Sequence, residues 1–409
     1  MRALEELRAV ERASVFKGGV AAGSLERRRE AVVFAYDDGY LRGEGPPVAT
    51  TLPLSSEPVV THAAGALPPF FSGLLPEGRR LSALRAAVKT SADDELTLLL
   101  AVGGDTVGDV QVLPEGEEPG AVEPRVTVEE WSDVRFADLF RASVGGAEGA
   151  EGIDRVAMPG VQDKVSARMI DVPVASESAR FVLKLEPPEF PHLVANEAFF
   201  LDAARRSGLE VAEAEVVRDA EGSPGLLVRR FDRVPDASGG VAMLAQEDGC
   251  QVLGRYPADK YRLTTEAVVG GLAGVCRAAP VAALTLIRQV AFAYLSCNGD
   301  AHARNFSVGR LPGGEWRVTP AYDLPSSYPY SDTTMALSVG GENREDIGRA
   351  DFVALGRAVG VRSRAVERAL DEMCGRVEEW IDELTTLPFD EGRLRKLRRA
   401  IEYRRDRLR

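Results

Sequence analysis

The spacing of apolar residues changes along the chain from a strand-like to a helix-like pattern. Residues 13–43 contain short apolar runs separated by glycine and aspartate, which is typical of strands joined by turns. Residues 79–102 carry apolar positions at helical spacing, as do long stretches after residue 265. The ranges in the second half that predict amphipathic or buried helices are 265–279, 281–296, 350–385 and 391–409.

Two stretches without apolar periodicity predict boundaries between parts of the chain. Residues 112–130, which include LPEGEEPGAVEP, are acidic and rich in proline and glycine, as linkers are. Residues 143–152, SVGGAEGAEG, are rich in glycine. We therefore expect an N-terminal α/β unit, a second unit that also contains strands and helices, and a helical part. Their predicted bounds are 1–112, 113–235 and 236–409.

The composition narrows the class of protein. Of the 409 residues, 45% are hydrophobic and 28% are charged, which is typical of a globular protein with more than one core. The chain has no long apolar run and its start lacks the layout of a signal peptide, so we expect a cytoplasmic protein with no membrane partner. The four cysteines form no CxxC pair and there are only three histidines, which favours reduced core thiols over a zinc site. A net charge of −13 argues against a chain that binds nucleic acid by itself over a broad face.

The stretch from Val290 to Pro325 concentrates polar residues directly after an apolar run. Asp300 is followed five positions later by Asn305, and Asp323 comes after a predicted hairpin. Phosphoryl transfer needs such a set, because one carboxylate orients the attacking hydroxyl while an amide and a second carboxylate hold Mg²⁺ on the nucleotide phosphates. An isolated Asp-x₄-Asn is more often a capped polar turn, so the interpretation depends on supporting residues upstream.

A predicted strand and the helix after it supply that support. Residues 181–185 form the strand and carry Lys184, while Asn196 is the predicted cap of a helix that runs to Arg206 with Glu197 in its first turn. Lys184 could lie along apolar surface with its amino group in water, and Glu197 could simply complement the helix dipole. The order of a lysine strand, a glutamate helix, Asp-x₄-Asn and a second aspartate is that of protein kinases, so we adopt the kinase interpretation.

A turn upstream of the lysine strand is a candidate phosphate-binding loop. In RVAMPGVQDKVSARMI, Pro159 and Gly160 predict a tight turn between two strand-like segments. Backbone N–H groups in such a turn can bind phosphates. An ordinary hairpin would give the same pattern and is the commoner case, so the turn alone does not distinguish the two.

Several motifs resemble those of one known family. NGDAHARNFSV followed by AYDL is similar to the catalytic and metal-binding loops of HipA-type serine/threonine kinases, the toxin halves of bacterial toxin–antitoxin pairs. FFSGLLPEGRR and AVGGDTVGDVQV resemble the N-terminal subdomain of that family, and AQEDGCQVLGRYPADKY resembles a signature of its second lobe. The resemblance spans nearly the whole chain. It implies an α+β, protein-kinase-like fold of two lobes: an α/β N-terminal lobe with an extra N-terminal subdomain, and a mainly α-helical C-terminal lobe.

The resemblance also implies a role for each residue of the candidate active site. Asp300 would be the catalytic carboxylate that accepts the proton of the substrate hydroxyl. Asn305 and Asp323 would hold Mg²⁺, and His302, which lies in the same loop, would position other groups rather than act as a base. Two cofactors are therefore implied, ATP and Mg²⁺.

The nucleotide would be bound by residues upstream of these loops. Lys184 would contact the phosphates and Glu197 would orient Lys184. The segment that would cover the nucleotide matches the family's Gly-x-Gln-x-Lys loop and consists of Gly160, Val161, Gln162, Asp163 and Lys164. The segment that would bind adenine through backbone groups consists of Arg229, Arg230 and Phe231. Position 229 is Arg where a known member has Glu, which affects side-chain contacts there but not backbone contacts.

One position departs from the family's pattern. Well-known members carry a serine three residues before the loop glycine, and its autophosphorylation silences the kinase. That position is Ala157 in this chain. We therefore predict that self-inactivation at this site is absent, and that restraint comes from a partner antitoxin or another mechanism.

These observations predict an ATP-dependent serine/threonine protein kinase that inhibits growth as the toxin of a toxin–antitoxin system. The resemblance implies a protein substrate such as an aminoacyl-tRNA synthetase, a helix-turn-helix antitoxin as partner, and DNA contact only through the antitoxin complex. Two alternatives stay open: a non-catalytic DNA-bound corepressor and a kinase of a small molecule. The basic stretch at 393–409 is equally compatible with a solvated helix and with a surface facing DNA or a partner.

Overall fold

The computed structural model of the protein describes residues 4–29, 31–43, 45–62, 65–120, 126–127, 131–143, 169–176, 179–236, 240–342 and 346–409. The predicted nucleotide-covering loop, Gly160 to Lys164, and Ala157 lie outside the described residues. Within the described ranges, no helix is both long enough and apolar enough to cross a membrane.

The N-terminal domain (η1 to β5) is built on a five-stranded antiparallel sheet with the order β4-β3-β2-β1-β5. Alternating apolar residues such as Val15, Leu25 and Phe34 face one core, against which the helices pack. The strands are β1 (Arg12–Lys17), β2 (Val20–Arg28), β3 (Ala31–Tyr36), β4 (Val59–Thr61) and β5 (Val110–Pro114). The helices are η1 (Leu4–Ala9), α1 (Asp38–Arg42), α2 (Pro69–Ser72), α3 (Gly78–Val88) and α4 (Glu95–Val102), so the helical spacing at 79–102 corresponds to two helices.

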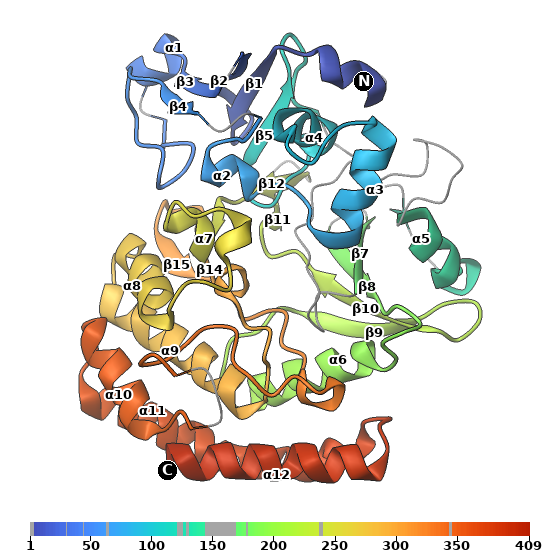
Figure 1. Ribbon diagram of the computed structural model, residues 1–409, viewed down its shortest axis with the longest axis vertical. Coiled ribbons are helices and arrows are strands. Elements are labelled where there is room, and N and C mark those ends of the chain that lie inside the picture. Colours follow the sequence, from blue (N-terminus) through green and yellow to red (C-terminus); the bar gives the residue numbers. More distant parts are fainter. Residues whose placement is uncertain are drawn as a thin grey trace.

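A second five-stranded sheet, with the order β6-β7-β8-β10-β9, lies below the N-terminal domain in Figure 1. Only the pairing of β6 with β7 is parallel. The sheet buries a small core of its own, which includes Val172, Leu183 and Leu185. Its elements are β6 (Val126–Thr127), η2 (Trp131–Asp133), α5 (Phe136–Ser143), β7 (Ile170–Ala175), β8 (Arg180–Leu185), β9 (Ala214–Arg218) and β10 (Pro224–Arg229).

The helical part follows a short hairpin, β11 (Arg233–Pro235) and β12 (Val241–Met243). Its centre is α9, whose residues from Val290 to Leu295 are all buried, as the apolar run predicted. A three-stranded sheet of β13 (Gln246–Asp248), β14 (Ser307–Arg310) and β15 (Trp316–Val318) carries the polar loops. The longer helices are α8 (Thr265–Val275), α9 (Ala279–Leu295), α10 (Arg349–Ala358), α11 (Ser363–Arg376) and α12 (Glu391–Leu408), and a short helix, α7 (Gly249–Val252), follows β13.

Helix α6 (Leu193–Arg206) follows β8 in sequence but shares the large core of the helical part. Its apolar side, which includes Val194 and Phe200, is fully buried there. Helix α6 also contacts β9 and β10 of the second sheet. Because α6 packs on both, it fixes the sheet relative to the helical part.

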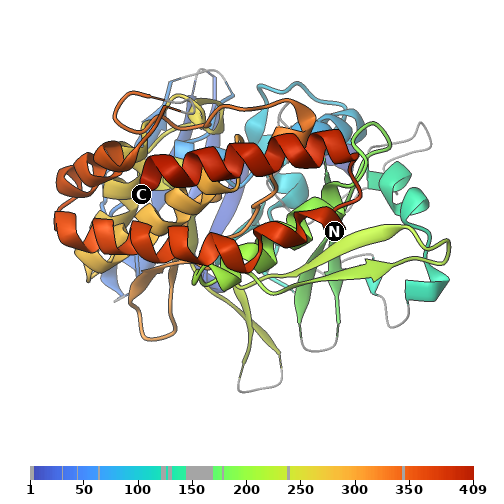
Figure 2. The ribbon, with the colours of Figure 1, turned by 90° about the horizontal axis from the view of Figure 1, so that it is seen from below.

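The basic C-terminal helix α12 lies at the end of the molecule opposite the N-terminal domain (Figures 1 and 2). Many of its cations are paired within the chain: Arg395 with Glu391 at 3.0 Å, and Arg398 with Asp382 at 2.7 Å. Arg404 is buried and donates to the carbonyl oxygen of Tyr294 at 2.8 Å. This pairing favours the solvated-helix interpretation of the basic stretch.

Candidate active site

Lys184, Glu197 and Asp323 meet although they come from separate elements. Lys184 lies on β8, Glu197 on α6, and Asp323 in the loop after β15. The Nζ atom of Lys184 is 2.6 Å from Oε1 of Glu197 and 3.1 Å from Oδ1 of Asp323. The predicted partnership of the strand lysine with the helix glutamate is thus present, with Asp323 as a third member.

The alternation of side chains along β8 explains why Lys184 points to this place. Leu183 and Leu185 face the core of the second sheet, so Val182 and Lys184 face the opposite side, where they line a cavity. Burial alone would lower the pKa of Lys184, but Asp323 and Glu197 outweigh it and raise the pKa. The amino group is therefore held as a cation that faces the cavity.

The predicted cap of α6 is wrong. The helix begins at Leu193 rather than after Asn196, which places Glu197 in the second turn. Asn196 is buried, and its side chain donates to the carbonyl oxygen of Ser326 and accepts from the Ser326 N–H, both at 2.9 Å. The buried amide of Asn196 therefore bonds both the carbonyl oxygen and the N–H of Ser326, and it holds the segment just after Asp323. This tertiary contact could not be predicted from the local sequence.

The catalytic loop predicted at 298–305 follows the end of α9 and is buried. Asn305 donates its Nδ2 to Oδ2 of Asp323 at 2.5 Å and accepts at Oδ1 from the N–H of His302 at 3.0 Å. Asp323 has a φ of 57°, in the left-handed region, and Asn298 donates to its carbonyl oxygen at 3.2 Å. The side chain of Asn298 thus supports an unusual backbone conformation that turns Asp323 toward Asn305 and Lys184.

Asp300 and His302 lie side by side in that loop. Asp300 is 2% exposed and accepts from the hydroxyl of Tyr261 at 2.8 Å, while the Tyr261 ring packs edge-on against His302. Burial lowers the pKa of His302 to about 3, so the imidazole is neutral at physiological pH. A neutral, buried ring is compatible with the positioning role expected of His302 and unsuited to carrying a proton at neutral pH.

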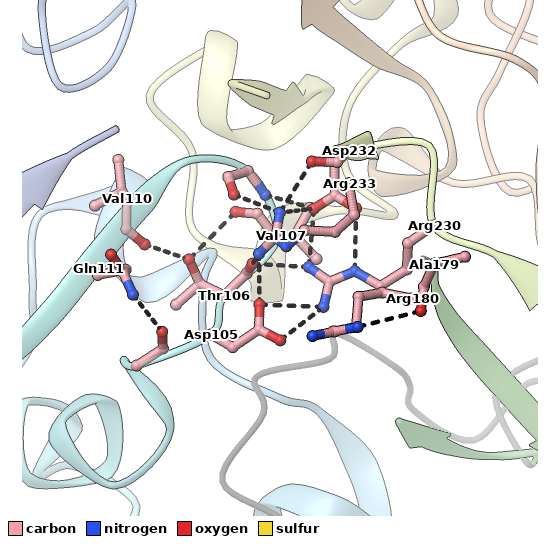
Figure 3. A network of polar contacts seen from close by, with 12 residues as sticks. Asp105, Thr106, Val107, Val110, Gln111, Ala179, Arg180, Arg230, Asp232 and Arg233 are labelled. Atoms are coloured by element: carbon pink, nitrogen blue, oxygen red, sulfur yellow. Dashed lines mark hydrogen bonds and ion pairs between the residues drawn. The ribbon is translucent and has the colours of Figure 1, made fainter. Parts of the chain in front are cut away.

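The predicted adenine-binding segment lines the same cavity, where the ring of Phe231 packs against Tyr322, but its two arginine side chains are engaged elsewhere. Arg229 pairs with Glu213 on the surface at 2.9 Å. Arg230 belongs to a buried cluster that joins this segment to Asp105 of the N-terminal domain (Figure 3). The N–H groups of Arg229 and Arg230 donate to the carbonyl oxygens of Glu213 and Arg180 at 2.8 and 2.9 Å. These two N–H groups are therefore engaged within the chain.

Asp171 is a cavity residue that sequence reasoning missed. It lies directly across from Lys184 in the antiparallel pairing of β7 with β8, so both side chains project from the same face. Burial raises the pKa of Asp171 to about 6, against the opposing effect of Lys184. The only available signal was a single charge in an apolar strand, and the register that pairs it with Lys184 is not visible in the sequence.

A second set of missed residues lies beside the catalytic loop. Glu77 forms ion pairs with both Arg304 and Lys260, and Arg304 also pairs with Asp248, so the four residues form one buried cluster. Arg304 lies within the predicted catalytic loop, and Glu77 lies far from it in sequence. Among the described residues, no group of three His, Cys, Asp or Glu side chains is arranged to hold a metal ion.

Comparison with known proteins places the whole chain in one family. Residues 13–113 match the HipA N-terminal domain and residues 156–381 match the HipA-like C-terminal domain. The protein named "Putative kinase Y4mE" of Sinorhizobium fredii is 33% identical over 346 residues, which are 79% of each chain. The serine/threonine-protein kinase toxin HipA of Shewanella oneidensis is 26% identical over 372 residues, which cover 85% of this chain and 83% of that protein.

The three-dimensional comparison agrees. The structure of Shewanella oneidensis HipA in its complex with HipB and operator DNA matches 97% of both chains, with a TM-score of 0.76 and 21% sequence identity. The predicted fold class is thus confirmed: an α+β, kinase-like fold with two lobes, an N-terminal addition and a mainly helical C-terminal lobe. By both domains and by its relatives, the chain belongs to the HipA family of kinases.

Proposed function

We propose that the protein is an ATP-dependent serine/threonine kinase that transfers the γ-phosphoryl group of ATP to a protein hydroxyl. The observation that carries this proposal is the meeting of Lys184, Glu197, Asn305 and Asp323 at one cavity, in the relation that kinases use. Asp300 lies in the same loop as Asn305 and is the proposed acceptor of the hydroxyl proton. The relatives named as kinases support the same activity.

Asn305 and Asp323 fit Mg²⁺ by their chemistry. Their side chains are in contact, with Nδ2 of Asn305 donating to Oδ2 of Asp323, and each side chain carries an oxygen atom of the kind that Mg²⁺ prefers. Mg²⁺ is commonly held by one or two carboxylates together with substrate phosphates rather than by a full protein cage. Mg²⁺ bound there would neutralise negative charge on the phosphates. The charged Lys184 acts in the same direction, because it presents a fixed cation where the transferring group gains charge.

The remaining parts of the site have proposed roles of their own. Glu197 keeps Lys184 aimed at the phosphates, His302 positions its neighbours, and Tyr261 orients Asp300 by donating to Oδ1. Gly160 to Lys164 would cover the phosphates, and backbone groups of residues 229–231 would bind adenine. We divide the chain accordingly into an N-terminal subdomain (1–112), a kinase N-lobe (113–235) and a helical C-lobe (236–409).

We further propose that the kinase is the toxin of a toxin–antitoxin pair. A relative is named a serine/threonine-protein kinase toxin, and a protein with the same fold is found in complex with HipB and operator DNA. A helix-turn-helix antitoxin is the proposed partner, which would bring the chain to DNA, and a translation protein such as an aminoacyl-tRNA synthetase is the proposed substrate. Restraint by that partner would replace self-inactivation, since Ala157 cannot accept a phosphoryl group.

Transfer of labelled γ-phosphate from Mg·ATP into proteins of a bacterial lysate tests the proposal. The wild-type protein should label one or a few proteins, and Asp300→Asn should abolish this labelling while still binding ATP. Asp202→Asn, which changes an exposed carboxylate of α6, is the matched control and should label as wild type does. ATP binding without any transfer by the wild type would contradict the protein-kinase proposal and favour the corepressor or a small-molecule kinase.

A further inference from the structure

The loop that contains Asp300 and Asn305 is held from the N-terminal domain. Arg304, inside this loop, is 6% exposed, and each nitrogen of its guanidinium has an acceptor. Nε donates to Oδ2 of Asp248 at 2.8 Å, Nη1 to Oε1 of Glu77 at 2.5 Å, and Nη2 to the carbonyl oxygen of Gly73 at 2.6 Å. Two of the three acceptors therefore belong to the N-terminal domain.

Glu77 makes a second contact that reaches the same loop. Its Oε2 accepts from Nζ of Lys260 at 2.7 Å, and Lys260 is 1% exposed. The carbonyl oxygen of Lys260 in turn accepts from the N–H of Ala303, next to Arg304, at 3.2 Å. One carboxylate thus holds the catalytic loop through a side chain of the loop and through a segment bonded to its backbone.

The charges of this cluster depend on Glu77. Burial alone would raise the pKa of Glu77, but Arg304 and Lys260 outweigh it and lower the pKa to about 2, so the side chain is ionised at physiological pH. Without Glu77, Arg304 would keep Asp248 as an ion-pair partner, while the buried Lys260 would lose the carboxylate with which it pairs. Removal of one partner from a buried ion pair leaves an uncompensated charge, which water entry or a shift of the loop would have to relieve.

The position of Glu77 is set by the fold of the N-terminal domain. It precedes α3, and its carbonyl oxygen accepts from the N–H of Leu81 in the first turn of that helix. Nearby, Gly73 approaches so closely that an added Cβ would lie 2.8 Å from the side chain of Gln251. The carboxylate of Glu77 therefore contacts the catalytic loop from a backbone that is fixed within the N-terminal domain.

We propose that Glu77 is a positioning residue for the catalytic loop, which makes the N-terminal domain a working part of the active site. This inference rests on the proposed kinase function, because the positioned groups are Asp300 and Asn305. A misplacement of about 1 Å at a reacting centre can cost about 100-fold in rate. We therefore expect Glu77→Gln to lower kcat by about 10- to 100-fold while the Kd for ATP changes by less than about 3-fold.

Thr50→Val is the matched control. Thr50 also crosses from the N-terminal domain to the helical part, where its N–H and hydroxyl donate to Glu247 at 2.8 and 2.6 Å. Glu247 lies on β13 rather than in the catalytic loop. This variant should keep a kcat close to that of the wild type. An equal loss of kcat in both variants would show a general effect of the interface and would overturn the proposal.

Hydrogen exchange provides a readout that does not need activity. The N–H groups of Ala303 and Asn305 donate to Lys260 and His302, so they report directly on the loop. Glu77→Gln should speed exchange in a peptide that spans the loop by about 10-fold or more, and Thr50→Val should not. If the wild type transfers no phosphate, the kinase proposal fails while exchange still decides whether Glu77 holds the loop.

Glu77→Asp is a second variant that tests the proposal even if Glu77→Gln does not fold. It keeps the charge that compensates Arg304 and Lys260, but it is one methylene too short to hold both. We expect it to fold, with a loss of kcat and loop protection smaller than that of Glu77→Gln. Wild-type kcat and wild-type loop exchange in Glu77→Asp, or in a folded Glu77→Gln, would overturn the proposal.

Discussion

At the scale of single residues, the site is governed by charges that are buried and matched. Lys184 has two carboxylate partners, Glu197 and Asp323, and it faces the cavity. Asp171 faces the same cavity from the neighbouring strand. Substitutions at these positions should therefore change both nucleotide binding and the free energy of unfolding. Whether each quantity rises or falls depends on which charged side chains lose or keep a partner of opposite charge.

If the proposed kinase site is correct, Lys184→Met should lower phosphoryl transfer by at least about 100-fold, because it removes the cation proposed to contact the phosphates. It also leaves Glu197 and Asp323 without their shared partner, so the free energy of unfolding should fall by about 3 kcal/mol. Urea denaturation and labelled-phosphate transfer measure the two effects. Lys89→Met, which removes an exposed lysine paired with Glu5, is the control; transfer by Lys184→Met at the wild-type rate would contradict the assignment.

Asp171→Asn should stabilise the protein near neutral pH and tighten ATP binding. The folded-state pKa of Asp171 is raised to about 6, so its contribution to stability is fully present below the unfolded value of 3.8 and is lost as pH rises through 6. Above pH 6 the ionised carboxylate is unfavourable by an amount on the order of 3 kcal/mol, which the amide avoids. Unfolding measured at pH 5 and pH 7.5 should show a gain for the variant that is about twice as large at the higher pH. An equal gain at both pH values would contradict this explanation.

At the scale of elements, the segment between β10 and β11 is fixed by buried ion pairs (Figure 3). Arg230 pairs with Asp105 at 3.1 Å and with Asp232 at 2.9 Å, and Arg233 contacts the same two carboxylates. Asp105 lies between α4 and β5 of the N-terminal domain. The segment proposed to bind adenine is therefore tied to that domain by buried ion pairs, as the catalytic loop is.

Asp105→Asn should lower the free energy of unfolding by about 3 kcal/mol, because it leaves Arg230 and Arg233 with only Asp232 in a buried site. Glu213→Gln is the matched control, since Glu213 pairs with Arg229 in the same region but on the surface. The control should cost less than about 1 kcal/mol. Equal effects in chemical denaturation would show that burial does not distinguish the two ion pairs.

At the scale of the whole molecule, the net charge predicts weak binding of the protein alone to DNA. The net charge is −13, and four of the eight lysines and arginines of α12 are paired with carboxylates of the same chain. The protein alone should therefore bind a DNA duplex with a Kd weaker than about 100 µM at physiological salt, at the weak end for non-specific binding. Fluorescence anisotropy with a labelled duplex measures this. A salt-sensitive Kd in the low micromolar range would contradict it.

Much of the fold and part of the site could be predicted because their signals are local. The strand alternation around Lys184 and the helical spacing around α9 follow from residues that are neighbours in sequence. The motif from Asp300 to Asp323 is compact enough to be compared with a known family, and together with Lys184 and Glu197 it predicts a kinase site. The start of α6 was missed because Asn196, a good cap by type, is instead used in a tertiary contact with Ser326.

The sequence by itself determined which residues are candidates for the chemistry, because spacing, apolar periodicity and family motifs are properties of short segments. Only the tertiary structure decided which residues support them. Glu77 contacts Arg304 across 227 positions, and Asp171 faces Lys184 through the register of β7 and β8. Such contacts depend on how separate cores pack and on strand register, and no local pattern of residues encodes either one. The N-terminal domain therefore looked like an accessory in the sequence and lies against the catalytic loop in the fold.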